Sequence, residues 1–129
     1  MTQRVISTGI INIRGKWLWL SCCLDTILYY QRFLEKIHAR KISTPIWKSH
    51  ITVVRGSDDF NVSKLGFLEG KEISFRYYPE EINTNGLYWW IEVFSKELEE
   101  LRFCLGLDPR PKYDFHLTIG KEIPTRLKY

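Results

Sequence analysis

Two short apolar segments of the chain carry the same His-x-Thr tripeptide, and this pair constrains the fold more than any other feature. One segment covers residues 48–55 and the other covers residues 114–121. Because residues i and i+2 of a β-strand point to the same face, each segment would place an imidazole beside a hydroxyl group and send its apolar neighbours to the opposite face. We therefore expect the two strands to lie together and to join four catalytic side chains in one site: His50, Thr52, His116 and Thr118.

Length and composition indicate one globular domain over residues 1–129. A chain of this length with 44% hydrophobic residues can bury one substantial core, and its formal charge of +4 suits an anionic partner such as a nucleotide. The N-terminus has no continuous apolar signal segment, and the longest apolar stretch, residues 17–28, is broken by polar residues. Three cysteines, an odd number, favour a reducing compartment. These features predict a cytoplasmic protein with no membrane partner.

The hydrophobic pattern predicts an α+β chain. Alternating apolar and polar residues predict strands at 5–13, 16–22, 48–55, 71–78, 87–94 and 114–121. Helical spacing predicts two helices, one capped by Asp25 and running to about residue 40, the other capped by Ser95 and ending at Gly106.

The two halves of this pattern match each other. Residues 16–56 and residues 87–121 each contain an aromatic strand, a capped helix, a loop with proline and a His-x-Thr strand. A duplicated strand–helix–strand unit would place the two His-x-Thr strands as equivalents beside one groove. We therefore predict a two-lobed fold with a largely antiparallel, concave sheet and helices on its outer faces.

Two histidines and two threonines suit acid–base chemistry on a phosphodiester. A neutral imidazole is the side chain best able to accept or donate a proton near pH 7, and threonine hydroxyls can hold phosphate oxygens. Neither motif is accompanied by Asp, His or Cys at the spacing of metal ligands, so we expect neither a metal nor a cofactor. The alternative is that both histidines are buried and hydrogen-bonded inside a sheet. The paired motifs favour catalysis.

Strand alternation also predicts what surrounds the histidines. The groove face is expected to receive Trp17, Trp19, Arg76, Tyr78, Tyr88, Trp90 and Glu92. Its tryptophans and Tyr88 could stack nucleobases, and Arg76 could neutralise a phosphate. The alternative for each aromatic residue is that it fills the second face of the sheet. Trp47, just before the first motif, is expected either to form a base platform or to pack as a staple.

These motifs resemble those of a known enzyme superfamily. The segments His50-Ile51-Thr52-Val53 and His116-Leu117-Thr118-Ile119 look like the paired motifs of the 2H phosphoesterases. The wider context, including Phe75-Arg76-Tyr77 and Tyr88-Trp89-Trp90, resembles the small phage anti-CBASS phosphodiesterases. This resemblance implies a duplicated α+β fold and metal-independent cleavage of 2′,3′-cyclic phosphates or of 2′-5′ or 3′-5′ linkages. The anti-CBASS enzymes degrade the cyclic oligonucleotide messengers of bacterial antiviral defence.

The resemblance thus implies a phosphoric diester hydrolase that cleaves 3′-5′ linkages of cyclic oligonucleotide messengers in the cytoplasm, of the host cell if the chain is phage-encoded. The expected partner is this or another nucleotide phosphodiester substrate, with no obligate protein partner. Alternatives within the class are an RNA-end 2′,3′-cyclic phosphodiesterase and a 2′-5′ oligoadenylate phosphodiesterase. An alternative of another class is a protein that binds a cyclic nucleotide or RNA without cleaving it.

Overall fold

The computed structural model describes residues 3–46, 48–58, 66–111 and 114–123. Within these ranges the chain is α+β and strand-rich, with two helices and one seven-stranded sheet whose pairings are antiparallel. The elements are β1 (Val5–Arg14), β2 (Trp17–Ser21), α1 (Leu24–His38), β3 (Lys41–Ser43), β4 (His50–Val54), β5 (Glu72–Thr84), β6 (Tyr88–Phe94), α2 (Lys96–Cys104) and β7 (His116–Ile123). The predicted α+β class with a largely antiparallel sheet is confirmed.

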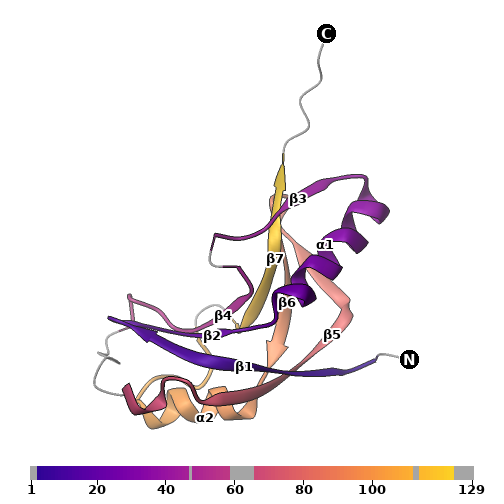
Figure 1. Cartoon of the computed structure of the whole chain (residues 1–129). Coiled ribbons are helices and arrows are strands. Elements are labelled where there is room, and N and C mark those ends of the chain that lie inside the picture. The colour runs from indigo at the N-terminus through magenta and orange to yellow at the C-terminus, as the bar shows by residue number, and fades with distance from the viewer. Residues whose placement is uncertain (1–2, 47, 59–65, 112–113, 124–129) are drawn as a thin grey trace.

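The sheet closes on itself. Its strand order is β3-β7-β4-β2-β1-β5-β6, and β6 also pairs with β7, so six strands form a ring while β3 pairs with the far end of β7 (Figure 1). Most neighbours share five or more residue pairs, but β4 and β7 are joined by the single pair Ile51 and Leu117. The two His-x-Thr strands therefore meet at the narrowest seam of the ring.

One face of the sheet forms the core. The apolar strand residues that alternate with the predicted groove face are all buried, namely Leu18, Leu20, Ile51, Ile73, Phe75, Trp89, Ile91, Val93, Leu117 and Ile119. Their neighbours along each strand, which alternate with them, are only half-buried or exposed, except for Gly120 beside Ile119, which is buried. The period-2 pattern of the sequence thus assigns the two faces correctly.

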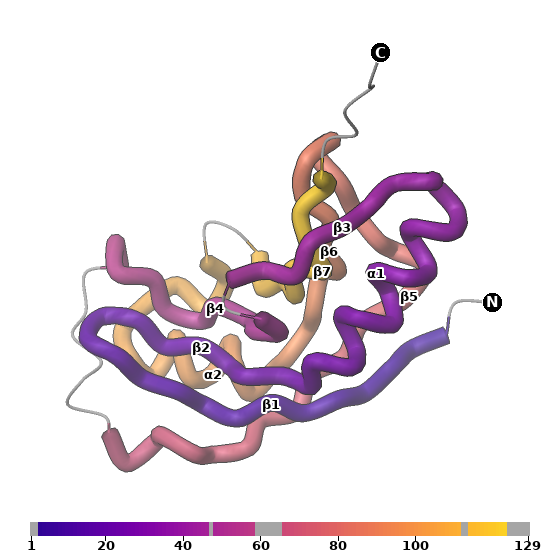
Figure 2. The backbone as a smooth tube through the Cα atoms, turned by 45° about the horizontal axis from the view of Figure 1, so that its top comes forward, coloured from indigo at the N-terminus to yellow at the C-terminus, as the bar shows by residue number. Residues whose placement is uncertain are grey.

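The helices cover different parts of the core face. Helix α1 contacts β3 and β7, and Gln31 donates a hydrogen bond from Nε2 to the carbonyl oxygen of Ile119 at 2.9 Å. Helix α2 contacts β4 and β5. In Figures 1 and 2 the two helices lie apart, at different ends of the sheet. Within the described part of the chain, neither helix is long and apolar enough to cross a membrane.

The helix ends agree with the sequence prediction in one case and differ in the other. Ser95 caps α2, since its side chain accepts a hydrogen bond from the backbone N–H of Leu98 at 3.2 Å. Helix α1, however, begins at Leu24 after Cys23, whose side chain makes no capping hydrogen bond. Asp25 lies inside the first turn, where its negative charge still complements the helix dipole. The prediction that Asp25 is the cap was wrong by two residues.

Two strand boundaries also differ from the prediction. Strand β5 continues past residue 78 to Thr84, and its register with β6 shifts between Tyr77 and Ile82. Pro79 lies inside this irregularity, where a missing backbone N–H costs no regular ladder hydrogen bond. Strand β3 was not predicted, because three residues are too short to show an alternating pattern.

Candidate active site

The four residues of the His-x-Thr motifs share one face of the sheet. Ile51 of β4 and Leu117 of β7 pair directly and are fully buried in the core. Because strand neighbours alternate, the residues on either side of this pair point to the opposite face. Those residues are His50, Thr52, His116 and Thr118, all half-buried. The pairing of β4 with β7 thus places the two motifs on one face of the sheet, although the described lining of the cavity beside His50 includes neither His116 nor Thr118.

The outer strands extend this face symmetrically. Strand β2 places Trp19 opposite Thr52 and Ser21 opposite His50. On the other side, β6 places Trp90 opposite Thr118 and Glu92 opposite His116. The two halves thus offer a tryptophan beside each threonine. They differ beside the histidines, where one has a hydroxyl group and the other a carboxyl group.

Both imidazoles are oriented in the same way. Nδ1 of His50 lies 3.2 Å from the carbonyl oxygen of Lys48, and Nδ1 of His116 lies 2.8 Å from the carbonyl oxygen of Asp114. Since a carbonyl oxygen can only accept, each Nδ1 must carry the hydrogen and donate it. The basic atom of each neutral ring is then Nε2, which is the tautomer that a proton-transfer site requires.

Burial lowers the pKa of His50 below its ordinary value, and the nearby positive charges of His116 and Arg55 lower it further. The hydrogen bond to the Lys48 carbonyl acts in the opposite direction, since it favours the protonated ring. The influence of His116 also reports that the two imidazoles lie within electrostatic range of each other. His50 is therefore neutral at pH 7 and can accept a proton.

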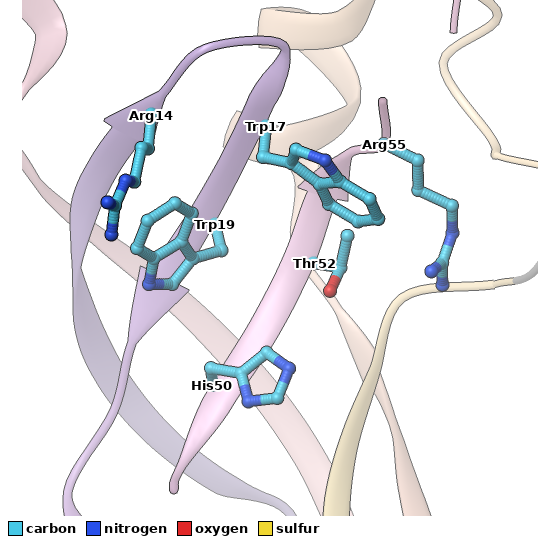
Figure 3. Close-up of a pocket in the computed structure, with 6 residues that line it drawn as sticks. All are labelled: Arg14, Trp17, Trp19, His50, Thr52 and Arg55. Atoms are coloured by element: carbon cyan, nitrogen blue, oxygen red, sulfur yellow. The ribbon is translucent and has the colours of Figure 1, made fainter. Parts of the chain in front are cut away.

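A cavity of about 610 Å³ opens beside His50 (Figure 3). Its described lining consists of Arg14, Trp17, Trp19, His50, Thr52 and Arg55. Figure 3 shows the two indoles of β2 between Arg14, which comes from β1, and Arg55, which follows β4. This volume lies in the range of small-molecule and cofactor sites. The lining combines aromatic surface with two positive charges, so it suits a flat, anionic ligand such as a nucleotide.

The structure brings together part of the predicted site. Trp17 and Trp19 line the cavity with His50 and Thr52, as expected from the sequence. Arg14 was not predicted to be part of the site. It is the last residue of β1 and comes directly before Gly15 in the turn to β2. Its pairing opposite Trp17 in the β1–β2 hairpin is the signal that could have placed it there. Arg55, which follows β4, is a further positive residue of the lining.

The predicted residues of the second half lie on the same face but outside the described lining of this cavity. Trp90 lies opposite Thr118, and the exposed Tyr88 lies opposite Lys121, whose Nζ is 5.8 Å from the centroid of the Tyr88 ring. Lys121 therefore makes a cation–π contact with Tyr88 at the end of β7.

Arg76 does not line the cavity beside His50. It lies in a separate hollow of about 290 Å³, together with Glu92, Arg110 and Asp114. Its guanidinium carbon lies 5.4 Å from the centroid of the Phe94 ring. The prediction that Arg76 contacts the same ligand as the tryptophans of β2 is thus not supported by its position. Trp47 lies outside the described residues.

Among the described residues, no group of three or more His, Cys, Asp or Glu side chains is arranged to hold a metal ion. Comparison with known proteins adds no assignment: no family model matches the chain, and neither a curated protein nor a solved structure matches it.

Proposed function

We propose that this chain is a metal-independent phosphodiesterase of the 2H type that hydrolyses 3′-5′ linkages in cyclic oligonucleotide messengers and thereby counteracts CBASS signalling. The observation that carries the proposal is the seam between β4 and β7. There His50 and His116 lie on one face within electrostatic range, each with Nδ1 bound to a backbone carbonyl. Two imidazoles that are both held with Nε2 as the exchanging atom suit one base and one acid acting on one phosphorus.

The proposed reaction needs only these side chains. One Nε2 accepts the proton of the attacking oxygen, from a ribose 2′-hydroxyl or a water, as that oxygen bonds to phosphorus. The other, protonated Nε2 donates its proton to the departing 5′-oxygen as the P–O bond breaks. Thr52 and Thr118 flank the histidines on the same face and would donate hydrogen bonds to the non-bridging oxygens.

The cavity beside His50 supports a nucleotide substrate. Trp17 and Trp19 provide faces on which a base can stack, and Arg14 and Arg55 provide charge for phosphate groups. Trp17 and Trp19 lie on β2, which pairs with the strand β4 that carries Thr52. A base stacked on either indole would therefore place its phosphate near the two motifs. The net charge of +4 would favour the approach of an anionic ligand.

The arrangement of the strands supports the 2H assignment within the α+β class. The order β2–α1–β3–β4 in the first half matches β6–α2–β7 in the second half except for the short strand β3, and the last strands of the two halves pair at the seam. The two lobes would then be the strands on either side of this seam. The helices tie the halves together, since α1 of the first half contacts β7 of the second half and α2 of the second half contacts β4 of the first half.

The test is a cleavage assay in EDTA with cyclic dinucleotides and trinucleotides, 2′,3′-cyclic nucleotides and 2′-5′ oligoadenylates, with products identified by mass spectrometry. We expect cleavage of the cyclic oligonucleotides that persists in EDTA. His50→Ala and His116→Ala should each reduce the rate by about 10²–10⁴-fold, since each removes a general acid or base. His38→Ala is the matched control, because it removes a histidine that belongs to neither His-x-Thr motif. The His38 ring lies at the end of α1 against Trp89, with a centroid distance of 4.9 Å.

Other outcomes would assign the chain differently. Cleavage of only 2′,3′-cyclic nucleotides or only 2′-5′ linkages would move the substrate to RNA ends or oligoadenylates. Tight binding without turnover would indicate a binding protein. Full activity in both histidine variants would refute the catalytic mechanism.

A further inference from the structure

The two motif strands carry the same irregularity at the same place, directly after the threonine of each motif. In the first half, Trp19 of β2 pairs with Thr52. The neighbouring β2 residue, Leu18, pairs with Val54, so β4 has one extra residue here, Val53. An extra residue on one strand of an antiparallel pair is a β-bulge, and bulges are common beside active sites, where they redirect side chains.

Strand β7 repeats this bulge in the second half. Trp90 of β6 pairs with Thr118. The neighbouring Trp89 pairs with Gly120, so the extra residue of β7 is Ile119. Both strands also have the same order of burial over five residues, with a half-buried histidine and threonine followed by two successive buried residues. The duplication therefore extends from the sequence motifs to the register of the strands.

Each bulge changes which residue returns to the face of the histidines. In a regular strand, the residue three positions after the threonine would point to the core. Because each bulge adds one residue, Arg55 and Lys121 lie on the face of the motif histidines instead. Arg55 lines the cavity beside His50, and Lys121 pairs with Tyr88 and lies over its exposed ring. The bulges thus give each motif a positive charge on its own face.

A buried side chain from the helix of the other half bonds each bulge. A bulge residue is unpaired in the ladder, so its carbonyl oxygen needs another donor when it is buried. Arg102 of α2 donates from Nη1 to the carbonyl oxygen of Val53 at 2.7 Å. Gln31 of α1 donates from Nε2 to the carbonyl oxygen of Ile119 at 2.9 Å. The two donors are only 3% and 6% exposed, respectively, so neither bond is weakened by competing solvent.

We propose that Gln31 is a positioning residue for the second motif, because it holds the bulge at Ile119. This bulge keeps Thr118 and Lys121 on the face of His116, where the hydroxyl and the ammonium group can contact a substrate phosphate. The buried arginine of α2 has the equivalent role for the first motif. The effect of Gln31 on turnover rests on the proposed phosphodiesterase function, whereas its effect on the strand does not.

Gln31 has a second partner, which supplies a matched control. Its Nε2 also donates to Oγ1 of Thr44 at 3.2 Å, and Thr44 directly follows β3 at an exposed position. Thr44→Val removes this contact and leaves the bond to Ile119 in place. Gln31→Met removes both bonds while keeping the side-chain volume nearly unchanged. A difference between the two variants therefore belongs to the bulge.

The first experiment follows the resonances of the ¹³C,¹⁵N-labelled protein. In Gln31→Met we expect the carbonyl carbon of Ile119 to shift upfield, because it loses its hydrogen bond, and the signals of Thr118 to shift with it. Thr44→Val should leave the Ile119 carbonyl close to its native position. The carbonyl carbon of Val53 is the internal reference and should move in neither variant.

The second experiment measures turnover of the cyclic dinucleotide, 2′,3′-cyclic nucleotide or 2′-5′ oligoadenylate that the native protein cleaves. Gln31→Met should lower kcat by about 5- to 20-fold, because Thr118 no longer holds the phosphate in place. In a Thr118→Val background the same substitution should lower kcat by less than about twofold, since the hydroxyl group that it positions is already absent. In a Thr52→Val background it should keep its full effect. A purely structural contact would give equal losses in the two backgrounds.

Gln31→Glu tests the same contact with a side chain of equal size, and it decides the question if the methionine variant does not fold. A carboxylate cannot donate to the Ile119 carbonyl, whereas a protonated carboxyl group can, and burial favours the protonated form. The kcat of Gln31→Glu, divided by that of the native protein at the same pH, should therefore rise as the pH falls from 8 to 5. The same ratio for Gln31→Met should stay constant.

An unchanged Ile119 carbonyl resonance in Gln31→Met would overturn the proposal, and so would equal losses of kcat in the Thr118→Val and Thr52→Val backgrounds. A native protein that cleaves no phosphodiester would refute the proposed function instead. The resonances of Ile119 and Thr118 would then still decide whether Gln31 positions the second motif.

Discussion

His50 is neutral at pH 7 and can therefore act as a base, but the same lowered pKa makes the fold less stable in acid. Its pKa is lowered by burial and by the charges of His116 and Arg55. The unfolded chain binds a proton at His50 below about pH 6.5, whereas the folded protein binds it only at lower pH. As the pH falls through this window, the unfolded state therefore gains protons that the native state does not, and the free energy of unfolding decreases.

We predict that His50→Asn reduces the loss of stability between about pH 7 and pH 5, because it removes the group responsible. Urea unfolding at a series of pH values measures this slope. The slope is the relevant quantity, since the substitution also changes local contacts at every pH. His38→Asn, at the exposed end of α1, is the matched control for the exchange of histidine for asparagine. Parallel curves for the native protein and His50→Asn would contradict the prediction.

Arg14 is the residue that sequence reasoning missed in the cavity, and its position separates binding from chemistry. It lies on β1, with β2 between it and the histidine strand β4. We predict that Arg14→Gln raises KM by about 5- to 20-fold and leaves kcat nearly unchanged, as expected for a charge that binds the substrate but not specifically the transition state. Steady-state kinetics with the cleaved nucleotide measures both constants.

The control for Arg14 is Arg4→Gln, an exposed arginine just before β1 that carries the same charge. If Arg4→Gln raises KM equally, the effect is one of overall charge. A fall in kcat with KM unchanged would place Arg14 in the chemical step instead.

At the scale of elements, one buried arginine attaches α2 to the strand that carries His50. Arg102 is only 3% exposed. Its Nη1 donates to the carbonyl oxygen of Val53 at 2.7 Å and contacts Oδ2 of Asp58 at 3.3 Å, while its Nε donates to the carbonyl oxygen of Asp108 at 2.7 Å. Asp58 is thus the partner of a buried cation and also accepts a hydrogen bond from the backbone N–H of Arg55 at 2.8 Å.

We predict that Arg102→Met lowers the free energy of unfolding by about 3 kcal/mol, because the Val53 and Asp108 carbonyls and the Asp58 carboxylate lose a charged donor while the volume is roughly kept. Urea unfolding measures the loss. Arg32→Met, at an exposed position of α1, should stay within about 0.5 kcal/mol of the native protein. Equal stability of the two variants would mean that this cluster contributes little.

The elements also show what the sequence can predict and what it cannot. Alternation in β4 and β7 assigns Ile51 and Leu117 to the core and the histidines to the other face, because the pattern has the period of a strand. Arg102 escapes such reasoning, since a single arginine on an amphipathic helix has the same pattern as a solvated one. The separation of Arg76 from the tryptophans of β2 depends on which strands pair, and residue order alone does not determine that.

At the scale of the whole molecule, the candidate site lies where the ring of strands is held most weakly. Strand β4 pairs extensively with β2, and β7 with β6, but β4 and β7 share the single pair Ile51 and Leu117. The sequence predicts that the two motifs meet, because it repeats them. It does not predict that the sheet closes at this point, because closure depends on the relative curvature of strands far apart in the chain.

A substrate phosphate held by residues of both strands would bridge this seam. Ligands that bind only the folded state stabilise it, and they protect most strongly the segments whose opening would release them. We predict that a phosphorothioate analogue of the cleaved nucleotide slows amide hydrogen exchange in β4 and β7 by at least about tenfold at a concentration of 100 Kd, and slows exchange in β1 and β5 less. Hydrogen-exchange mass spectrometry measures this. The double variant His50→Ala/His116→Ala is the control, because it lacks both imidazoles that would contact the phosphate at the seam. Protection of β1, β2 and β4 without β7 would show that the ligand occupies the cavity beside His50 without bridging the seam, and that the two histidine strands do not act on one phosphate.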